Sequence, residues 1–168
     1  MLRHMIAGLA VSLFAFPALA DEPVTIAEIR FGEDLLDKAD EYGPRELDRL
    51  AQSLHEDLSN ALSEIILADG TVLSARILDA TPNRPTFEQL TDRPGLSYTR
   101  SYGRGGARLE AELISAQGEV IETYSYSWRT PRLEDARATS TWTDAERTFR
   151  RFAHRIANDL EAYEHTGS

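Results

Sequence analysis

The chain has 168 residues, a formal net charge of −10 at pH 7 and no cysteine. An excess of carboxylates repels polyanions, so this composition argues against non-specific binding to nucleic acid. The lack of cysteine excludes disulfide bonds, thiolate metal sites and cysteine nucleophiles, and also the lipid that a lipoprotein carries on a cysteine.

The first residues are typical of a secretory signal. Arg3 and His4 precede an apolar run from Met5 to Phe16, and Ala18-Leu19-Ala20 offers the small residues that signal peptidase accepts. The run is much shorter than the roughly 20 apolar residues of a membrane-spanning helix. We therefore predict cleavage after Ala20, export to the periplasm and no stable transmembrane anchor after cleavage.

Cleavage would leave 148 of the 168 residues, a common size for one domain. The mature chain would keep 17 of the 18 basic residues and all 28 acidic ones, for a formal charge of −11. We expect residues 21–168 to form a single periplasmic α+β domain without a linker.

The N-terminal part of the mature chain predicts a strand, a loop and a helix. Residues 24–31 are rich in β-branched side chains, but their apolar alternation breaks near residues 27–28, which implies a bulge or two covered faces. The acidic residues 33–43 are interpreted as a loop. A helix is expected from Pro44, whose missing N–H costs nothing at the first helical position, to about Ser63. Its apolar stripe follows three- and four-residue steps: Leu47, Leu50, Ala51, Leu54, Leu58, Ala61, Leu62 and Ile65.

Two hairpins are predicted next. Asp69-Gly70 lies between apolar runs, which favours a tight turn that would place Leu67 opposite Val72. A second hairpin is expected over residues 107–128, with Gln117-Gly118 as a two-residue turn and Ala116 opposite Glu119. In this register small and aliphatic residues meet large or acidic ones on one sheet face: Leu113 faces Glu122, Ala111 faces Tyr124, Leu109 faces Tyr126 and Ala107 faces Trp128.

The last helix is expected to begin at Thr143, whose hydroxyl would form a capping box with Glu146. Its apolar stripe is Ala145, Phe149, Phe152, Ala153, Ile156, Ala157, Leu160 and Tyr163. The arginines at 147, 150, 151 and 155 lie mostly outside this stripe among carboxylates, which is typical of a solvated face. The order of elements predicts an α+β fold in which an antiparallel sheet of about four to five strands carries two amphipathic helices on one face.

No motif in the sequence predicts catalysis. His55-Glu56 lacks the second histidine of a zinc-protease helix, and His154 is more typical of a half-buried structural residue than of a catalyst. The Gly-x-Ser-x-Gly motif of serine hydrolases is absent. Residues 103–106 precede a strand, whereas a phosphate-binding loop should open a helix. We therefore expect no catalytic residue, no metal site and no cofactor.

One segment departs from the acidic background. Residues 81–108 contain five arginines and only two carboxylates, for a local charge of +3, whereas the rest of the mature chain carries −14. The segment is a long proline- and glycine-containing loop with a short strand expected at residues 96–102. Long loops of this kind often carry functional residues. Guanidinium groups bind carboxylate and phosphate, and tyrosine rings stack. The candidate binding residues are Arg84, Arg93, Tyr98, Arg100, Tyr102, Arg104 and Arg108. The alternative is that these arginines only form salt bridges to the acidic excess.

The assembled pattern resembles a loose class of small bacterial envelope proteins of unknown function, many of them lipoproteins. The segments that carry the resemblance are residues 24–31, 79–86, 105–107, 116–120 and 141–145. Because the lipidated cysteine of the lipoproteins is missing here, membrane attachment does not follow from the resemblance. The class also supplies no catalytic residues.

These observations favour a non-enzymatic periplasmic domain that binds or scaffolds an anionic or glycan component of the envelope. The partner would be an envelope protein, peptidoglycan or a lipid head group. One alternative is a hydrolase that acts on peptidoglycan or glycan through carboxylates, which predicts a cleft with two facing acids, at least one of raised pKa. Another is a subunit of an envelope assembly complex, which predicts a contiguous exposed apolar patch.

Overall fold

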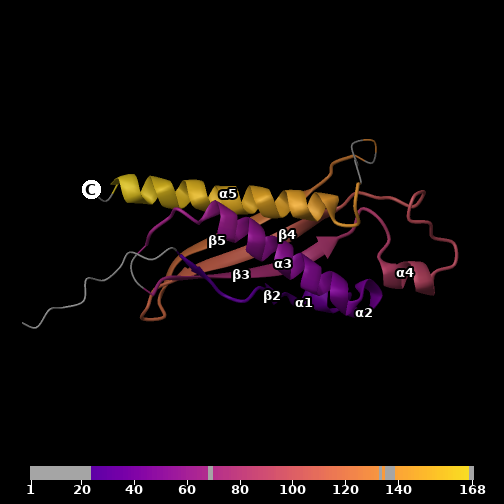
Figure 1. The fold of residues 1–168 in the computed structure, drawn as a ribbon, viewed down its shortest axis with the longest axis horizontal. Coiled ribbons are helices and arrows are strands. Elements are labelled where there is room, and N and C mark those ends of the chain that lie inside the picture. Colours follow the sequence, from indigo (N-terminus) through magenta and orange to yellow (C-terminus); the bar gives the residue numbers. More distant parts are fainter. Residues whose placement is uncertain (1–23, 68–69, 133, 135–138, 167–168) are drawn as a thin grey trace, which may run out of the picture.

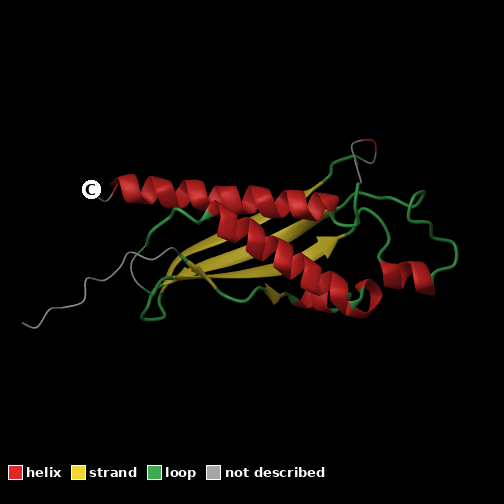
Figure 2. Cartoon of the chain, viewed as in Figure 1, coloured by secondary structure: helices red, strands yellow, loops and turns green. Residues whose placement is uncertain are grey.

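Two long helices lie side by side across one face of a five-stranded sheet (Figure 1). They are α3, Pro44–Ala61, and α5, Thr143–Thr166 (Figure 2). This computed structural model describes residues 24–67, 70–132, 134 and 139–166, so the predicted signal at 1–20 lies outside the described residues. The expected fold class, α+β with two amphipathic helices on one face of a sheet, is confirmed.

The sheet has the strand order β1-β3-β4-β5, and β2 also pairs with β3. The strands β3, Val72–Thr81, β4, Gly106–Ile114, and β5, Val120–Arg129, pair antiparallel. The short strands β1, Thr25–Ile26, and β2, Arg30–Phe31, pair with β3 in parallel, so the sheet is not wholly antiparallel as expected. A parallel pair needs a crossover connection, and α3 provides it on the helix-bearing face.

The expected strand over residues 24–31 is interrupted. β1 and β2 follow one another along β3, with Ile26 opposite Leu73 and Phe31 opposite Ile77. The break in the apolar alternation near residues 27–28 therefore marks the point where the chain leaves the sheet and rejoins it. The bulge alternative was the closer of the two expectations.

The expected loop over residues 33–43 is wrong, because it contains two short helices. These are α1, Glu33–Leu36, and α2, Ala39–Tyr42. Leu35 is fully buried, and buried Tyr42 packs edge-on against Trp142 with ring centres 5.4 Å apart. These two inward-facing side chains anchor α1 against β3, and α2 against α3, α4 and Trp142.

The amphipathic helix α3 begins at Pro44 as predicted and buries Leu47, Leu50, Leu54 and Leu58. The hairpin expected after it is wrong. Both edges of β3 are occupied at Val72, by Thr25 of β1 and by Ile114 of β4, so Leu67 is not its partner. The turn residues 68–69 of that hairpin lie outside the described residues.

The register of the hairpin between β4 and β5 is confirmed. Its pairs are Leu113 with Glu122, Ala111 with Tyr124, Leu109 with Tyr126 and Ala107 with Trp128. The turn differs from the expected two-residue form, because Ser115 donates its N–H to the Glu119 carbonyl and Gly118 has φ of 84°. A left-handed glycine is typical of a three-residue loop. A register shift between Leu113 and Ile114 then restores the predicted pairing.

The helix α5 begins at Thr143 as predicted, but the expected capping box is wrong. The Thr143 hydroxyl accepts from the N–H of Ser140 at 2.8 Å, and the Glu146 N–H donates to the Trp142 carbonyl. The hydroxyl therefore orders the loop before the helix. The apolar stripe of α5 is buried as expected from Ala145 to Leu160, and the side chain of Tyr163 lies outside the described residues.

Candidate functional site

The long segment between β3 and β4, residues 82–105, is called the excursion here. It projects beyond the sheet at the end opposite the C-terminus (Figure 1). It contains α4, Phe87–Asp92, whose start is fixed by a capping box between Thr86 and Gln89. The short strand expected at residues 96–102 is wrong, because this stretch forms turns, with the Ser101 N–H donating to the Ser97 carbonyl at 2.8 Å.

A buried carboxylate holds both ends of the excursion. Asp144, in the first turn of α5, is fully buried, and its Oδ2 accepts from Asn83 Nδ2 at 2.6 Å and from the Gly105 N–H at 3.3 Å. The Thr130 hydroxyl after β5 donates to the same oxygen at 2.6 Å, while Arg147 donates to Oδ1 at 3.1 Å. This number of donors compensates the loss of hydration. The excursion is thus fixed to the start of α5.

The amide of Asn83 completes this network. Asn83 Oδ1 accepts from the Asp144 N–H at 2.8 Å, and the backbone of Asn83 bonds to Thr141 and Gly103. A Cβ at Gly105 would overlap the Asn83 side-chain amide, so only glycine fits beside it. The excursion is therefore anchored by specific side-chain geometry at both ends.

Two of the arginines predicted to bind a ligand are engaged in ion pairs. Arg93 lies 3.0 Å from Glu41 of α2, and Arg108 pairs with Asp34 of α1. Both partners come from the N-terminal helices that the sequence did not predict. The salt-bridge alternative therefore describes Arg93 and Arg108.

The other five predicted binding residues lie along the excursion itself. Arg84 donates to the Tyr98 carbonyl at 2.5 Å, and its guanidinium lies 5.3 Å from the centre of the Tyr98 ring. Tyr98 is 42% exposed and Tyr102 is 53% exposed. Among the described residues Arg100 and Arg104 form no ion pair, and Arg104 donates to the Pro131 carbonyl at 2.9 Å. This part of the excursion combines exposed aromatic rings with uncompensated positive charge.

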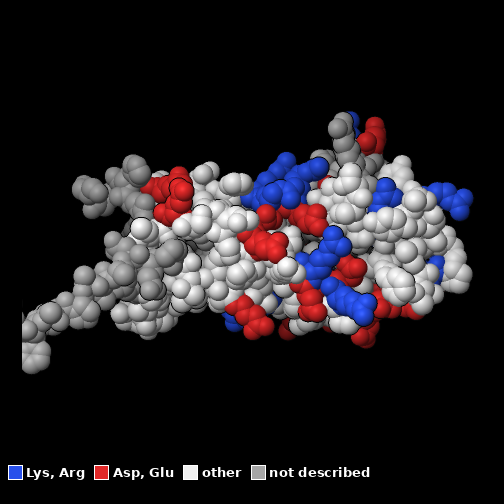
Figure 3. Space-filling view, in the orientation of Figure 1, with Lys and Arg blue, Asp and Glu red and all other residues white. Residues whose placement is uncertain are grey.

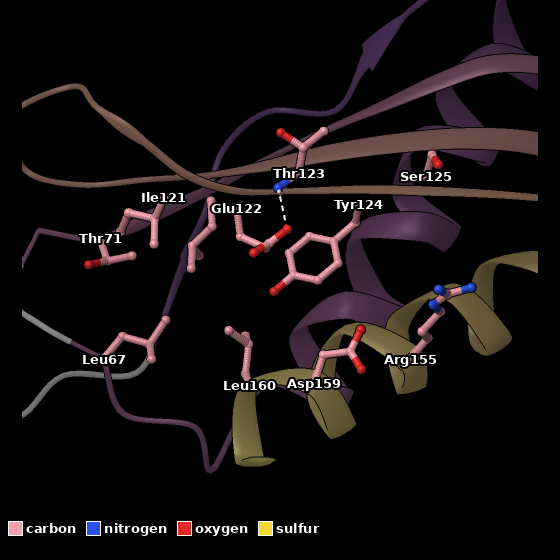
Figure 4. Close-up of a pocket in the computed structure, with 11 residues that line it drawn as sticks. Leu67, Thr71, Ile121, Glu122, Thr123, Tyr124, Ser125, Arg155, Asp159 and Leu160 are labelled. Atoms are coloured by element: carbon pink, nitrogen blue, oxygen red, sulfur yellow. Dashed lines mark hydrogen bonds between the residues drawn. The ribbon is translucent and has the colours of Figure 1, made fainter. Parts of the chain in front are cut away.

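A larger cavity lies away from the excursion, between β5 and the second half of α5 (Figure 4). Its volume is about 660 Å³. Five consecutive residues of β5, Ile121 to Ser125, form one wall, and the opposite wall is formed by Arg155, Asp159 and Leu160 of α5. Leu67, Thr71 and Leu113 complete the lining.

The Tyr124 ring points from β5 toward α5 in this cavity, and the Asp159 carboxylate points back toward it (Figure 4). Burial raises the pKa of Tyr124 to about 12, and the carboxylates of Glu122 and Asp159 oppose its ionisation further. Tyr124 is therefore a neutral phenol at physiological pH. It presents a hydrogen-bonding group in a cavity of mixed polar and apolar lining.

The carboxyl group of Asp57 lies outside this cavity. Burial raises its pKa, Arg150 opposes that shift, and Glu146 adds to it. Asp57 lines none of the three cavities found in the described part of the chain. A carboxylate hydrolase is expected to have an acid of raised pKa inside its cleft. Here the acid whose pKa is raised, Asp57, lies outside the cavity that holds Glu122 and Asp159.

The arginines of α5 do not form a purely solvated face. Arg151 lies 4.6 Å and Arg147 5.5 Å from the centre of the Trp128 ring on β5. A guanidinium over an aromatic face is attracted by the ring quadrupole. His154, expected to be half-buried, is exposed on the same helix.

Neither the Asn83–Asp144 network nor the stack on Trp128 could be predicted directly from the sequence. An acid in the first turn of a helix is common at any exposed helix start, so Asp144 carried no special signal. The four-residue spacing of Arg147, Arg151 and Arg155 was a usable signal, because such residues share one helix face. Within the described ranges, His, Asp and Glu form no group of three arranged to hold a metal ion. Every helix in those ranges is too short or too polar to span a bilayer.

No family model matches this chain, and no curated protein matches it. Among solved structures, it is similar to a protein assigned as a lipoprotein from Caulobacter crescentus CB15, at 17% identity and a TM-score of 0.40 over 85% of this chain and 92% of that one. It is also similar to the PelC dodecamer from Paraburkholderia phytofirmans, at 12% identity and a TM-score of 0.48 over 88% of this chain and 92% of that one. A minor lipoprotein from Acinetobacter baumannii is similar at 14% identity and a TM-score of 0.33, over 83% of this chain and 94% of that one. Two of these three are described as lipoproteins, in keeping with the loose resemblance noted from the sequence. At these identities the similarity does not extend to function.

Proposed function

We propose that this chain is a non-enzymatic periplasmic domain that binds an anionic glycan of the envelope, such as peptidoglycan, through the excursion. The binding surface is formed by Tyr98, Arg100, Tyr102 and Arg104. The observation that carries the proposal is that two exposed tyrosines, and two arginines without an ion pair among the described residues, lie on a segment fixed at both ends by Asp144.

The chemistry of these side chains favours a glycan that bears carboxylates. Sugar rings pack against aromatic faces, and guanidinium groups bind carboxylate with two parallel hydrogen bonds. Anchoring by the buried network lowers the entropy that the loop would lose on binding. A neutral glycan would use the tyrosines but leave Arg100 and Arg104 without a role.

The separation of acids supports binding over hydrolysis. A carboxylate hydrolase needs a proton-donating acid of raised pKa beside a second carboxylate in one cleft. Glu122 and Asp159 share the large cavity, but burial raises the pKa of Asp57, which lies outside it. The excursion surface carries arginines and tyrosines in place of a facing acid pair.

Co-sedimentation with purified peptidoglycan sacculi tests the proposal. The charge-reversed variant Arg100→Glu/Arg104→Glu should bind about tenfold more weakly or worse, because attraction becomes repulsion. The matched control is Arg45→Glu/Arg49→Glu on α3, which changes the net charge equally and should bind like the wild type.

Three results would contradict the proposal. The first is unchanged binding by the excursion variant, and the second is an equal loss in both variants, which would indicate a non-specific charge effect. The third is binding to vesicles of anionic lipid without any binding to sacculi, which would assign the surface to a lipid head group.

A further inference from the structure

The two edges of the sheet are protected very differently. One edge is formed by β1 and β2, which have 2 residues each. The other is β5, which has 10 residues and contains no proline, glycine or lysine. Within the described part of the chain, β5 pairs with β4 alone. Natural proteins usually shorten, bend or charge an edge strand because its free N–H and C=O groups accept another strand.

The large cavity lies along this unpaired edge. Successive side chains of a strand point to opposite faces of a sheet. Five consecutive residues, Ile121 to Ser125, line the cavity, so the empty space runs along β5 at its unpaired edge. The start of the strand is apolar and open, since Val120 is 54% and Ile121 is 47% exposed. An added strand would find both backbone partners and room for side chains here.

The helix α5 follows β5 step by step. Trp128 contacts Arg147 and Arg151, Tyr126 stacks on Phe152, and Tyr124 shares the cavity with Arg155 and Asp159. Moving along the strand by two residues therefore corresponds to moving along the helix by about one turn. The helix α5 therefore accompanies most of β5, and we call the cavity, together with the unpaired edge of β5 beside Arg151, the β5–α5 groove.

The helix side of this groove is positively charged over its first part. Figure 3 shows Lys and Arg side chains gathered over the first half of α5, with Asp and Glu nearer its C-terminal end. Arg151 and Arg155 form no ion pair among the described residues. Arg147 is partly neutralised by Asp144.

We propose that the β5–α5 groove binds an extended acidic segment of a partner protein, which adds to the sheet as a strand beside β5. The spacing of the charges fits this mode of binding. Residues four apart on a helix are about 6 Å apart along its axis. Alternate residues of a strand are about 6.6 Å apart. Two acidic residues separated by one position would therefore lie beneath Arg151 and Arg155 together.

The cavity extends this recognition pattern by one position. Beyond Arg155 the groove carries Asp159 and Glu122, which would repel a third acid, and the apolar side chains of Leu67, Ile121 and Leu160. The next inward-facing residue of the partner should therefore be apolar. The segment has the form acid-x-acid-x-apolar, in which x is a residue that points to the opposite sheet face.

A second copy of this chain is a poorer occupant. The added strand would then be a second β5, whose only acid is Glu122, so it could not place acids beneath both Arg151 and Arg155. An acidic partner gains from the same arginines, which is why charge complementarity favours it.

Binding of a synthetic peptide tests this inference directly. The probe is a fluorescent peptide of 10 residues, the length of β5, that contains the acid-x-acid-x-apolar sequence, and anisotropy reports its affinity. We expect Arg151→Glu and Arg155→Glu each to weaken binding about tenfold. Arg45→Glu on α3 is the matched control and should leave the affinity unchanged. Far-UV circular dichroism and thermal melting establish that each variant is folded.

Two N-methylated peptides test the strand geometry. Alternate residues of an added strand direct their N–H groups toward β5, and the others direct them to solvent. Methylation of the N–H groups directed toward β5 should abolish binding, and methylation of those directed to solvent should leave the affinity unchanged. A merely electrostatic contact would tolerate both equally, and that result would overturn the proposal.

Two further results would also overturn it. One is an affinity that does not respond to Arg151→Glu or Arg155→Glu. The other is that the chain self-associates in sedimentation velocity and that the peptide dissociates this assembly, which would assign the groove to a second copy. The variant Arg100→Glu/Arg104→Glu should keep full affinity for the peptide, so the groove can be tested separately from the excursion.

Discussion

The molecule has two groups of arginines that differ in how they are brought together. Those of residues 81–108 are close in sequence, yet Arg93 and Arg108 are paired with Glu41 and Asp34. On α5, Arg147, Arg151 and Arg155 are spread over nine residues and still lie along one side of the β5–α5 groove. Density of charge along a chain therefore does not define a surface, whereas helical spacing does.

The difference also concerns what fixes each surface. The excursion is a loop whose shape depends on a buried polar network around Asp144. The arginines of α5 lie on a regular helix whose apolar stripe is buried in the core. Damage to one network should therefore affect the excursion much more than the groove.

The largest effect is expected from Asp144→Ala. This change leaves the buried amide of Asn83 and the hydroxyl of Thr130 without their acceptor, and the free energy of unfolding should fall by about 3 kcal/mol. Urea denaturation measures the loss. Asp48→Ala, at an exposed position of α3, should change stability by less than about 0.5 kcal/mol. Equal losses at the two positions would mean that the network does not hold the excursion.

The next effect is expected from Gly105→Ala. Its Cβ would overlap the Asn83 amide, so overpacking should cost about 1–3 kcal/mol. Gly95→Ala is the control, because no atom lies within 4 Å of its Cβ position. Replacing that glycine should be neutral or stabilise by up to about 1 kcal/mol. Urea denaturation of both variants compares a tight site and an open site within the same excursion.

A smaller effect is expected at the stack between β5 and α5. A double-mutant cycle of Trp128→Ala with Arg151→Ala should give a coupling energy of about 0.5–1 kcal/mol, because the guanidinium lies over the ring. The same cycle with Arg45→Ala should give a value close to zero. Thermal or urea unfolding provides the four stabilities of each cycle. A coupling energy of zero for Arg151 would remove the contact that positions the groove.

The smallest effect is expected at Asp57, whose Oδ2 is buried without a hydrogen-bond partner among the described residues. Burial raises the pKa of its carboxyl above the ordinary value of an aspartic acid. The folded chain therefore binds the proton more tightly than the unfolded chain, and this favourable contribution is lost as pH rises through the folded pKa. Asp57→Asn should raise the melting temperature slightly near neutral pH and not below about pH 4, the unfolded value. A gain that is equal at both pH values would contradict this assignment.

Much of the fold follows from short-range patterns. The stripe from Leu47 to Leu58 predicts α3, and the alternation over residues 107–128 predicts the register of β4 and β5 pair by pair. Both depend on a periodic burial pattern that one segment carries within itself. Proposed binding residues such as Tyr98 and Tyr102 could also be predicted, because the unusual composition of the excursion is contained in one continuous segment.

The remaining features depend on distant parts of the chain. The strands β1 and β2 are ordered by β3, about 45 residues later, which no local pattern contains. Likewise Asn83 and Asp144 are 61 residues apart in sequence. The ion pairs of Arg93 and Arg108 could not be predicted, because their partners Glu41 and Asp34 lie on helices formed around Leu35 and Tyr42. Long-range polar pairing accounts for the misassigned arginines, whereas the loop expected at residues 33–43, the strand expected at residues 96–102 and the capping box expected at Thr143 were misjudged local preferences.

A crossed binding measurement tests most directly whether the two arginine groups are separate sites. The affinities of Arg100→Glu/Arg104→Glu and of Arg151→Glu/Arg155→Glu are determined for sacculi and for the acidic peptide. We predict that the first variant loses affinity for sacculi and still binds the peptide, and that the second loses affinity for the peptide and still binds sacculi. A parallel loss of both ligands in both variants would contradict the existence of two distinct surfaces.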